Sequence, residues 1–318
     1  MSFSLDVKKE LLNKMDTARH CQIAEFAALM SFTAHVIETD EGLIGIESLT
    51  ENPLVVEKFE LLLKSLFDVK ETDYTKSHES KASKLVTIRI FKQQLVANIL
   101  QTIKWCDDTF LSIEEQFLDS RIIQKDCCKK AFIRGAFLAA GSISDPNKFY
   151  HYEIVCIFEE DAQKLVELLQ FFNLDAKITE RKNNFVVYIK EGNNITDVLN
   201  LMGAVRLQME LFNIMIYKGI SNDVNRKVNC ETANLNKTIE AAVKQVNDIE
   251  YIRDNVGLDK LKPNLREVAL LRLENQDTNL KDLGEMLDPP VGKSGVNHRL
   301  RKISEFAEAL RESKGAIS

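Results

Sequence analysis

The sequence predicts an α+β fold in which one order of elements, αββαββα, occurs twice and is followed by an all-α region. Three observations support this class. Helical and strand spacings of hydrophobic residues recur in the same order in two stretches of the chain. The five prolines lie where one element should give way to the next. After Ala204 only helical spacings remain.

The first copy is expected over about residues 18–105. Its helix over 53–67 is the clearest element, because Asn52 can cap a helix that begins at Pro53 and is followed by hydrophobic residues at helical spacing. The other expected elements are a helix from Cys21 (CQIAEFAALMSF), two strands around VIETDEGLIGIES, two strands ending with KLVTIRIF, and a helix over 94–103.

The second copy is expected over about residues 126–220 and repeats this order. Its elements are a helix in CCKKAFIRGAFLAAG, strands around HYEIVCIF, a helix over 159–172, strands in DAKITERK and NFVVYIK, and a helix over 195–202. A repeat of this length that is used only twice predicts two pseudosymmetric halves rather than a solenoid.

Shorter segments precede and join the copies. SFSLDVKKELLNKM alternates hydrophobic and charged residues at helical spacing, which predicts an N-terminal helix of a cytoplasmic protein rather than a secretory signal. No stretch approaches the roughly 20 apolar residues of a membrane span, so no membrane contact is expected. The connector over 107–126 carries one short helical pattern, of Ile113, Phe117 and Leu118, and is interpreted as a tether.

The C-terminal region is expected to be a separate domain. Helical patterns cover 204–217, 232–251, 265–273, 280–287 and 293–310, and the polar run SNDVNRKVNCETANLNKT (221–238) is interpreted as a linker. We therefore predict a first domain over 1–220 and a second over 221–318. Residues 221–318 hold 16 of the 42 Lys+Arg and 16 of the 48 Asp+Glu, so the net charge of −6 belongs to the first domain.

The six cysteines predict neither a disulfide framework nor a metal site. They are scattered, which favours reduced thiols, and the sequence has no C-x-x-C or H-x-x-x-H spacing of the kind that zinc sites use. The adjacent His20 and Cys21 are expected to be ordinary helix residues. No metal and no cofactor are predicted.

The nine residues IRGAFLAAG (133–141) resemble LAGLIDADG, the motif of a class of homing endonucleases, and keep glycine at its third and ninth positions. An offset of 107 aligns the first helices of the two copies and places small residues four apart on both, which predicts a close helix-helix seam. An ordinary helix-helix contact would be enough to explain these nine residues taken alone. The duplicated αββαββα order favours the LAGLIDADG fold, in which two sheets form a saddle over DNA.

Nuclease chemistry in that fold needs a carboxylate at the end of each seam helix, because the divalent cations that activate water require hard anionic ligands. The corresponding residues are Thr33 and Ala140, and neither can replace a carboxylate. Glu38 and Asp145 lie past the expected helix ends. The sequence therefore predicts that the protein is not an enzyme.

The segment TNLKDLGEMLDPPVGKSGVNHRLRKISEFAEAL (278–310) predicts a helix-turn-helix, with Thr278 as the cap of its first helix. On its second helix, Val296, Leu300 and Ile303 share a core-facing stripe with Ala307 and Leu310. Residues 292–302 include four basic residues and no acidic one, all away from that stripe. A solvated basic face of an ordinary bundle is the alternative; the crowding of cations and amides on the first two turns favours double-stranded DNA as the partner.

Four segments together closely resemble the WhiA family of Gram-positive bacterial regulators: FIRGAFLAAGSISDP, VNCETANLNKT, IEYI and LGEMLDPPVGKSGVNHRLRKI. The resemblance extends over essentially the whole chain. It implies a degenerate LAGLIDADG domain joined to a C-terminal helix-turn-helix over about 279–310. It also implies a role in cell division and chromosome segregation, and in transcription regulation.

We therefore expect a non-catalytic DNA-binding protein that is associated with the nucleoid. The alternative is a protein-interaction scaffold of the division machinery that its helix-turn-helix localises. Transcription or division proteins are the protein partners considered. The sequence predicts no particular oligomeric state. The expected DNA-binding residues are Asn279, Leu280, Lys281, Leu283, Gly284, Lys293, Ser294, Gly295, Asn297, His298, Arg299, Arg301 and Lys302.

Overall fold

The computed structural model describes residues 2–39, 43–78, 84–106 and 113–315. The chain divides into two compact units, unit 1 (residues 1–218) and unit 2 (residues 219–318). Parts of two sequence predictions, the middle of VIETDEGLIGIES (40–42) and the start of the connector (107–112), lie outside the described residues. No helix among those described combines the length and the hydrophobicity that crossing a membrane requires.

Unit 1 begins with α1 (Phe3–Leu12) and continues with the first αββαββα copy. In α3, the Asn52 side chain accepts a hydrogen bond from the Leu54 amide, and Pro53 opens the helix as predicted. The elements of this copy are α2 (Arg19–Thr33), β1 (Ala34–Glu38), β2 (Ile44–Thr50), α3 (Pro53–Phe67), β3 (Thr75–His78), β4 (Val86–Ile90) and α4 (Gln93–Thr102), with the 3-10 helix η1 (Glu71–Asp73) before β3.

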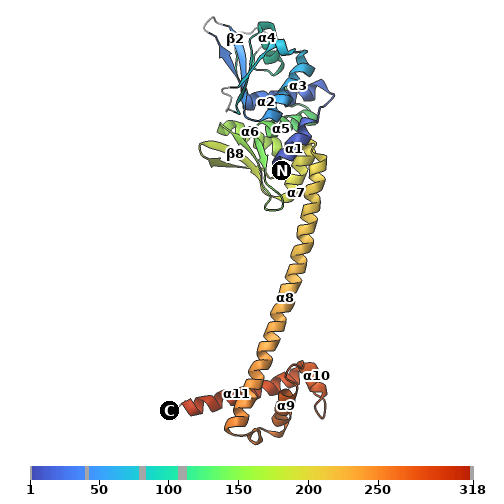
Figure 1. Ribbon diagram of the computed structural model, residues 1–318, viewed down its shortest axis with the longest axis vertical. Coiled ribbons are helices and arrows are strands. Elements are labelled where there is room, and N and C mark those ends of the chain that lie inside the picture. Colours follow the sequence, from blue (N-terminus) through green and yellow to red (C-terminus); the bar gives the residue numbers. More distant parts are fainter. Residues whose placement is uncertain (1, 40–42, 79–83, 107–112, 316–318) are drawn as a thin grey trace. The chain divides into compact units, whose positions relative to one another are not determined.

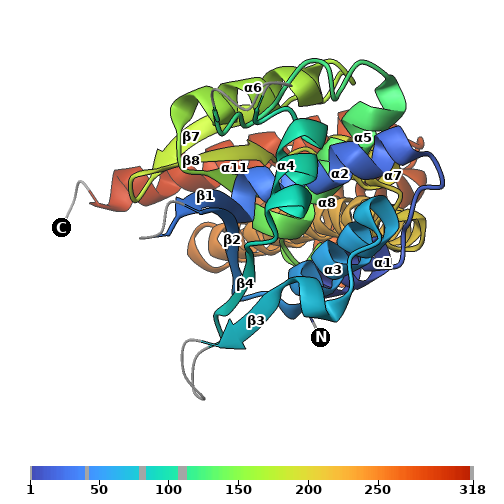
Figure 2. The ribbon, with the colours of Figure 1, turned by 90° about the horizontal axis from the view of Figure 1, so that it is seen from above.

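The second copy follows the same order, which confirms the predicted duplication. Its elements are α5 (Asp126–Ala140), β5 (Gly141–Ile143), β6 (Tyr152–Cys156), α6 (Glu159–Gln170), β7 (Lys177–Arg181), β8 (Asn184–Ile189) and α7 (Gly192–Met202). Each copy forms one antiparallel sheet, with strand orders β1-β2-β4-β3 and β5-β6-β8-β7. Both sheets lie on the same side of the α2 and α5 pair (Figure 1 and Figure 2).

The seam between α2 and α5 joins the two halves of unit 1. Both helices have 15 residues, and each residue of α2 corresponds to the residue 107 positions later in α5. Small residues hold the backbones close: a Cβ added to Gly135 would lie 2.5 Å from the Glu25 carbonyl oxygen and 2.8 Å from the Ala28 Cβ. Any side chain at Gly135 would therefore force the helices apart.

Four ionised side chains cross this seam, and three of them are almost fully buried. Glu25 and Lys58 have no exposed surface, and Arg134 is 2% exposed. Glu25 accepts hydrogen bonds from Arg134 Nε and Nη2, each 2.9 Å long, and its carboxylate lies 3.0 Å from Lys58 Nζ. Arg134 also pairs with Asp16 at the edge of the seam. Opposite charges thus satisfy each other where water is excluded.

The connector between the halves is not helical over its described part (113–125), which corrects the expected helical pattern. Its hydrophobic residues instead face the seam. Phe117 is 8% exposed and makes edge-to-face ring contacts with Phe32 and Phe132, with centroids 5.1 Å and 5.9 Å apart. The Trp105 indole donates a hydrogen bond to the Gln116 carbonyl, 2.8 Å away. The spacing of these hydrophobic residues therefore reflects packing against the core and not a helical period.

The expected linker over 221–238 is helical, which corrects the break between two helices that its polar composition predicted. One helix, α8 (Val205–Asn255), runs through both flanking helical patterns and through the polar run. Residues 221–238 contain neither proline nor glycine, and a helix already formed on both sides extends through polar residues at little cost. The side chains of this stretch are exposed. Its polar composition therefore reflects solvation of a helix on all faces.

Unit 2 packs the end of α8 against three further helices. They are α9 (Pro263–Glu274), α10 (Leu280–Glu285) and α11 (Lys293–Gly315), with the 3-10 helix η2 (Leu258–Lys260) before α9. Its core is separate from that of unit 1 and combines Ile249 and Ile252 of α8 with buried residues of α9, α10 and α11. This core fixes the orientation of α11 about its own axis.

Candidate nucleic-acid interface

The α11 helix turns its apolar stripe inward and its cationic face outward. Val296, Leu300, Ile303 and Ala307 are at most 1% exposed, as the spacing predicted, and Leu310 is half-buried. On the opposite face Arg299 and Gly295 are half-buried, and the following residues are exposed: Lys293, Ser294, Asn297, His298, Arg301 and Lys302. The α11 members of the predicted interface therefore gather at the surface of unit 2, on the first turns of that helix.

The Arg301 side chain has one acidic neighbour. Its Nε donates a hydrogen bond to Glu305 Oε1, 3.1 Å away on the next turn. The two side chains are 77% and 58% exposed, and an ion pair so open to water contributes little. Arg301 can therefore exchange Glu305 for a phosphate or a base edge at small cost.

The α10 helix precedes α11 in the chain, and a side chain caps its N-terminus. Asn279 Oδ1 accepts hydrogen bonds from the amides of Lys281 and Asp282, at 3.0 Å and 3.1 Å. The cap is thus Asn279 and not Thr278, which corrects the sequence prediction. Because the Asn279 side chain is engaged in capping, it positions α10 in this structure. Leu280 is half-buried and Lys281 is exposed.

Two of the expected contact residues are inside the domain. Leu283 has no exposed surface and belongs to the core of unit 2, and Gly284 is also buried. The Gly284 carbonyl accepts a hydrogen bond from the Val291 amide, 2.9 Å away, which closes the turn between α10 and α11. These burials contradict a direct side-chain contact with DNA. Both residues pack at the turn that sets the direction of α11 relative to α10.

Gly284→Ala should destabilise unit 2 by about 1–3 kcal/mol, because the added Cβ would lie 2.0 Å from the Val291 carbonyl oxygen. Hydrogen exchange of the α9, α10 and α11 amides would measure the loss. Gly292→Ala is the matched control, since no atom lies within 4 Å of a Cβ added there. Equal exchange rates in the two variants would contradict the packing role.

Arg272 of α9 holds the segment between α9 and α10, and the sequence did not predict this role. Its side chain is 2% exposed, and its Nη1 donates hydrogen bonds to the carbonyls of Asn275, Gln276 and Thr278, the last at 2.7 Å. Burial lowers its pKa from the usual value for arginine. An arginine on a helix is usually exposed, so no sequence pattern distinguishes this one.

Thr33 and Ala140, which the sequence predicts in place of the nuclease acids, lie at the ends of α2 and α5. Thr33 Oγ1 donates a hydrogen bond to the Leu29 carbonyl, 2.8 Å away, and lies 3.0 Å from the Ser48 hydroxyl oxygen. Ala140 contributes only a methyl group. Glu38 and Asp145 are exposed, and Asp145 accepts hydrogen bonds from the backbone and side chain of Asn147 instead. These positions offer no paired carboxylates for a cation.

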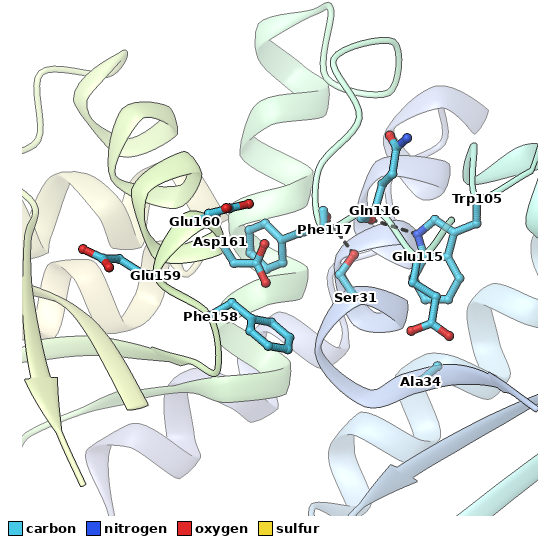
Figure 3. Close-up of a pocket in the computed structure, with 10 residues that line it drawn as sticks. All are labelled: Ser31, Ala34, Trp105, Glu115, Gln116, Phe117, Phe158, Glu159, Glu160 and Asp161. Carbon is cyan, nitrogen blue, oxygen red and sulfur yellow. Dashed lines mark hydrogen bonds between the residues drawn. The ribbon is translucent and has the colours of Figure 1, made fainter. Parts of the chain in front are cut away.

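A pocket of about 470 Å³ in unit 1 is lined by four acids and no cation. Glu115 approaches it from the connector, and its carboxylate accepts a hydrogen bond from the Val36 amide. Glu159, Glu160 and Asp161 line it from the start of α6, although the Glu159 carboxylate points away from Glu115 (Figure 3). Facing carboxylates disfavour a phosphate backbone at this pocket.

One cluster of metal-binding side chains occurs among the described residues, away from these sites. His20, Cys21, Cys127 and Cys128 place their ligand atoms within 4.8 Å of one another. The sequence does not reveal this cluster, because the two pairs are distant in the chain and meet only through the seam. The offset of 107 that aligns α2 with α5 pairs His20 with Cys127 and Cys21 with Cys128.

Comparison with known proteins gives matches for both units. A model of the WhiA LAGLIDADG-like domain matches residues 129–221, and a model of the WhiA C-terminal HTH domain matches residues 224–307. A protein of Lachnospira eligens named "Probable cell division protein WhiA" is 66% identical over 99% of both chains. One of the same name from Lachnoclostridium phytofermentans is 45% identical over 98% of this chain and all of that protein.

A solved structure is similar along the whole chain. It is the crystal structure of full-length DUF199/WhiA from Thermatoga maritima, which is 28% identical, with 97% of this chain and 99% of that chain covered and a TM-score of 0.57. The matched fold agrees with the one described here, an α+β domain of two sheets followed by a helical HTH domain.

Proposed function

This chain belongs to the WhiA family, and from that premise we propose that it is a non-catalytic protein that binds double-stranded DNA through α11 and acts in cell division. Chromosome segregation and transcription regulation, on the bacterial nucleoid, are the processes that we infer for it. The names of its relatives support the division role, and the HTH match supports DNA binding.

The observation that carries this proposal is the composition and exposure of one face of α11. Four cations, two amide or hydroxyl side chains and an imidazole project from its first turns, while the opposite stripe is buried. In a helix-turn-helix the N-terminal part of the second helix enters the major groove. There Asn can pair with adenine and Arg with guanine, while flanking cations meet phosphates.

Arg301→Ala and Asn297→Ala should each reduce discrimination between target and random duplexes by about 1–3 kcal/mol, because such side chains read base edges in bidentate fashion. Lys293→Ala and Arg299→Ala should weaken binding to both duplexes alike, because phosphate contacts carry no sequence information. Titrations with labelled target and random duplexes at one salt concentration measure both effects. Identical behaviour of all four variants would refute this division of roles.

The absence of catalysis follows in this proposal from Thr33 and Ala140. A hydroxyl already bonded within the protein and a methyl group cannot hold the divalent cations of a nuclease. The relevant assay is incubation of supercoiled plasmid with the purified chain and Mg²⁺ or Mn²⁺. Nicking by the wild type would overturn this part of the proposal.

A second candidate function, a protein-interaction scaffold that α11 localises on DNA, is favoured by the acidic pocket of unit 1. Phe158 at the pocket is 66% exposed and the neighbouring Ile157 is 69% exposed. Apolar side chains beside carboxylates suit a partner segment that carries both apolar and basic residues. Capture of a division or transcription protein that survives nuclease treatment and is lost in Phe158→Ala would support this candidate.

A further inference from the structure

We propose that His20, Cys21, Cys127 and Cys128 form a Zn²⁺ site that joins the N-terminal ends of α2 and α5. The site takes three thiolates and one imidazole, a set typical of structural zinc centres. One pair comes from each half of unit 1, so the ion would bridge the duplicated copies across their seam. Neither the DNA-binding face nor the acidic pocket uses these residues.

The distances between the ligand atoms suit a tetrahedral ion. His20 Nδ1 lies 3.2 Å from Cys128 Sγ, 3.3 Å from Cys21 Sγ and 4.0 Å from Cys127 Sγ. With Zn–S near 2.3 Å and Zn–N near 2.0–2.1 Å, a tetrahedral centre requires N···S edges of about 3.5 Å and S···S edges of about 3.8 Å. The observed N···S distances lie on both sides of that value. The N···S distances would need to change by about 0.2–0.5 Å, and an S···S edge at the 4.8 Å limit of the cluster would need to shorten by about 1 Å.

The position on the helices favours thiolates. Cys21 is the third residue of α2, and Cys127 and Cys128 are the second and third residues of α5. Neither helix has a side-chain hydrogen bond at its N-cap, and the one acid in the first turn of α5, Asp126, pairs with Lys129 at 3.1 Å. Free amides and the positive end of the helix dipole stabilise negative sulfur at such positions. Two helix ends meet here, and both act on the same cluster.

Burial divides the cluster into an inner and an outer pair. Cys21 and Cys128 are 4% and 3% exposed and pack against the small seam residues Ala24 and Ala131. His20 and Cys127 are exposed, so an ion can enter from solvent. Burial, with a contribution from Cys127, raises the pKa of the Cys21 thiol to about 12 in the absence of an ion. A bound dication reverses that preference, and binding must therefore release protons.

The pseudosymmetry of unit 1 explains how pairs that are adjacent in sequence can build a closed site. Two adjacent ligands on one helix cannot surround an ion. Residues at equivalent positions of two helices related by an approximate two-fold axis face each other across that axis. Because His20 corresponds to Cys127 and Cys21 to Cys128, the four groups converge on the seam. The ion would join the two halves at the N-terminal ends of α2 and α5. The ring contacts of Phe117 with Phe32 and Phe132 lie farther along the two helices.

Metal binding by the full chain tests the proposal. Protein stripped with EDTA, kept under a reductant that does not bind metals and incubated with Zn²⁺ should retain one Zn²⁺ per chain after gel filtration. Co²⁺ in place of Zn²⁺ should produce the thiolate-to-metal absorption and the strong d–d bands of a tetrahedral site. Cys127→Ser should weaken binding at least about ten-fold, since even the loss of an outer-shell partner has an effect of that size.

Cys230→Ser is the matched control, because Cys230 is another exposed cysteine, on α8. It should bind Zn²⁺ like the wild type, and its melting temperature should rise with Zn²⁺, whereas that of Cys127→Ser should not. Equal Zn²⁺ affinity in Cys127→Ser and wild type would overturn the proposal. So would a disulfide within the cluster, detected as fewer than six reactive thiols in denatured protein purified without reductant.

Discussion

Replacing Arg134 with alanine should lower the free energy of unfolding of unit 1 by about 3–5 kcal/mol, the largest stability effect expected in this chain. The substitution leaves the Glu25 carboxylate, which has no exposed surface, with only Lys58 as an ionised partner. Arg134 also donates a hydrogen bond to the Met202 carbonyl, 3.2 Å away at the end of α7. The variant therefore loses both charge balance at the seam and a tie to α7.

Urea unfolding followed by tryptophan fluorescence measures this loss selectively. Trp105 is the single tryptophan, and at 2% exposure in unit 1 it reports on the unit that contains the seam. Lys177→Ala is the control: Lys177 and Asp175 form an ion pair whose members are 59% and 60% exposed. That substitution should cost less than about 1 kcal/mol. A similar midpoint for both variants would mean that the buried ion pairs do not stabilise the seam.

Replacing Lys293, Arg299, Arg301 and Lys302 together with glutamine should abolish most of the salt dependence of DNA binding. If each cation neutralises one phosphate, log affinity falls with log salt by a slope of about −3.6. A rise from about 50 to about 200 mM salt should then weaken wild-type binding about 150-fold through this helix alone. The substituted chain should lack that decrease. The helix itself should persist, because glutamine is a good helix former and these residues lie outside the core.

The matched control removes four exposed cations of unit 2 that are not on α11: Arg226, Lys227, Lys237 and Lys262. Both variants change the net charge equally, so a general electrostatic effect would weaken binding in both. Titrations over a range of salt separate the two outcomes, and maps of bound chromosomal sites test the same variants in cells. A wild-type slope near zero, or equal slopes in the two variants, would contradict DNA binding by α11.

Local patterns predicted most elements closely because the forces that define them act within a few residues. The helix over 53–67 has its cap, its proline and its hydrophobic period in the sequence, and its bounds agree with the structure. Two predictions were wrong: the break in the helix over 221–238 and the helix in the connector. Both rested on local composition or spacing, which does not determine how a segment packs or is solvated. A polar run can be a solvated helix, as in α8, and a short apolar pattern can be packing residues, as at Phe117.

In the candidate interface, too, some features followed from local sequence patterns and others did not. Amphipathic spacing on α11 predicted which residues are buried and which are exposed, because a 100° rotation per residue determines the face of each side chain. The roles of Leu283 and Gly284 could not be assigned in this way. Their burial depends on how α10 packs against α11, which involves residues from both sides of the turn.

The sequence by itself determined the duplicated α+β order, the presence of Thr33 and Ala140 where nuclease acids were expected, and the cationic face of α11. Only the tertiary structure decided that Glu25, Lys58 and Arg134 neutralise one another, and that His20, Cys21, Cys127 and Cys128 meet. The physical reason is distance along the chain. Periodicity and capping are local, whereas the pairing of charges and ligands depends on a seam between helices 107 residues apart.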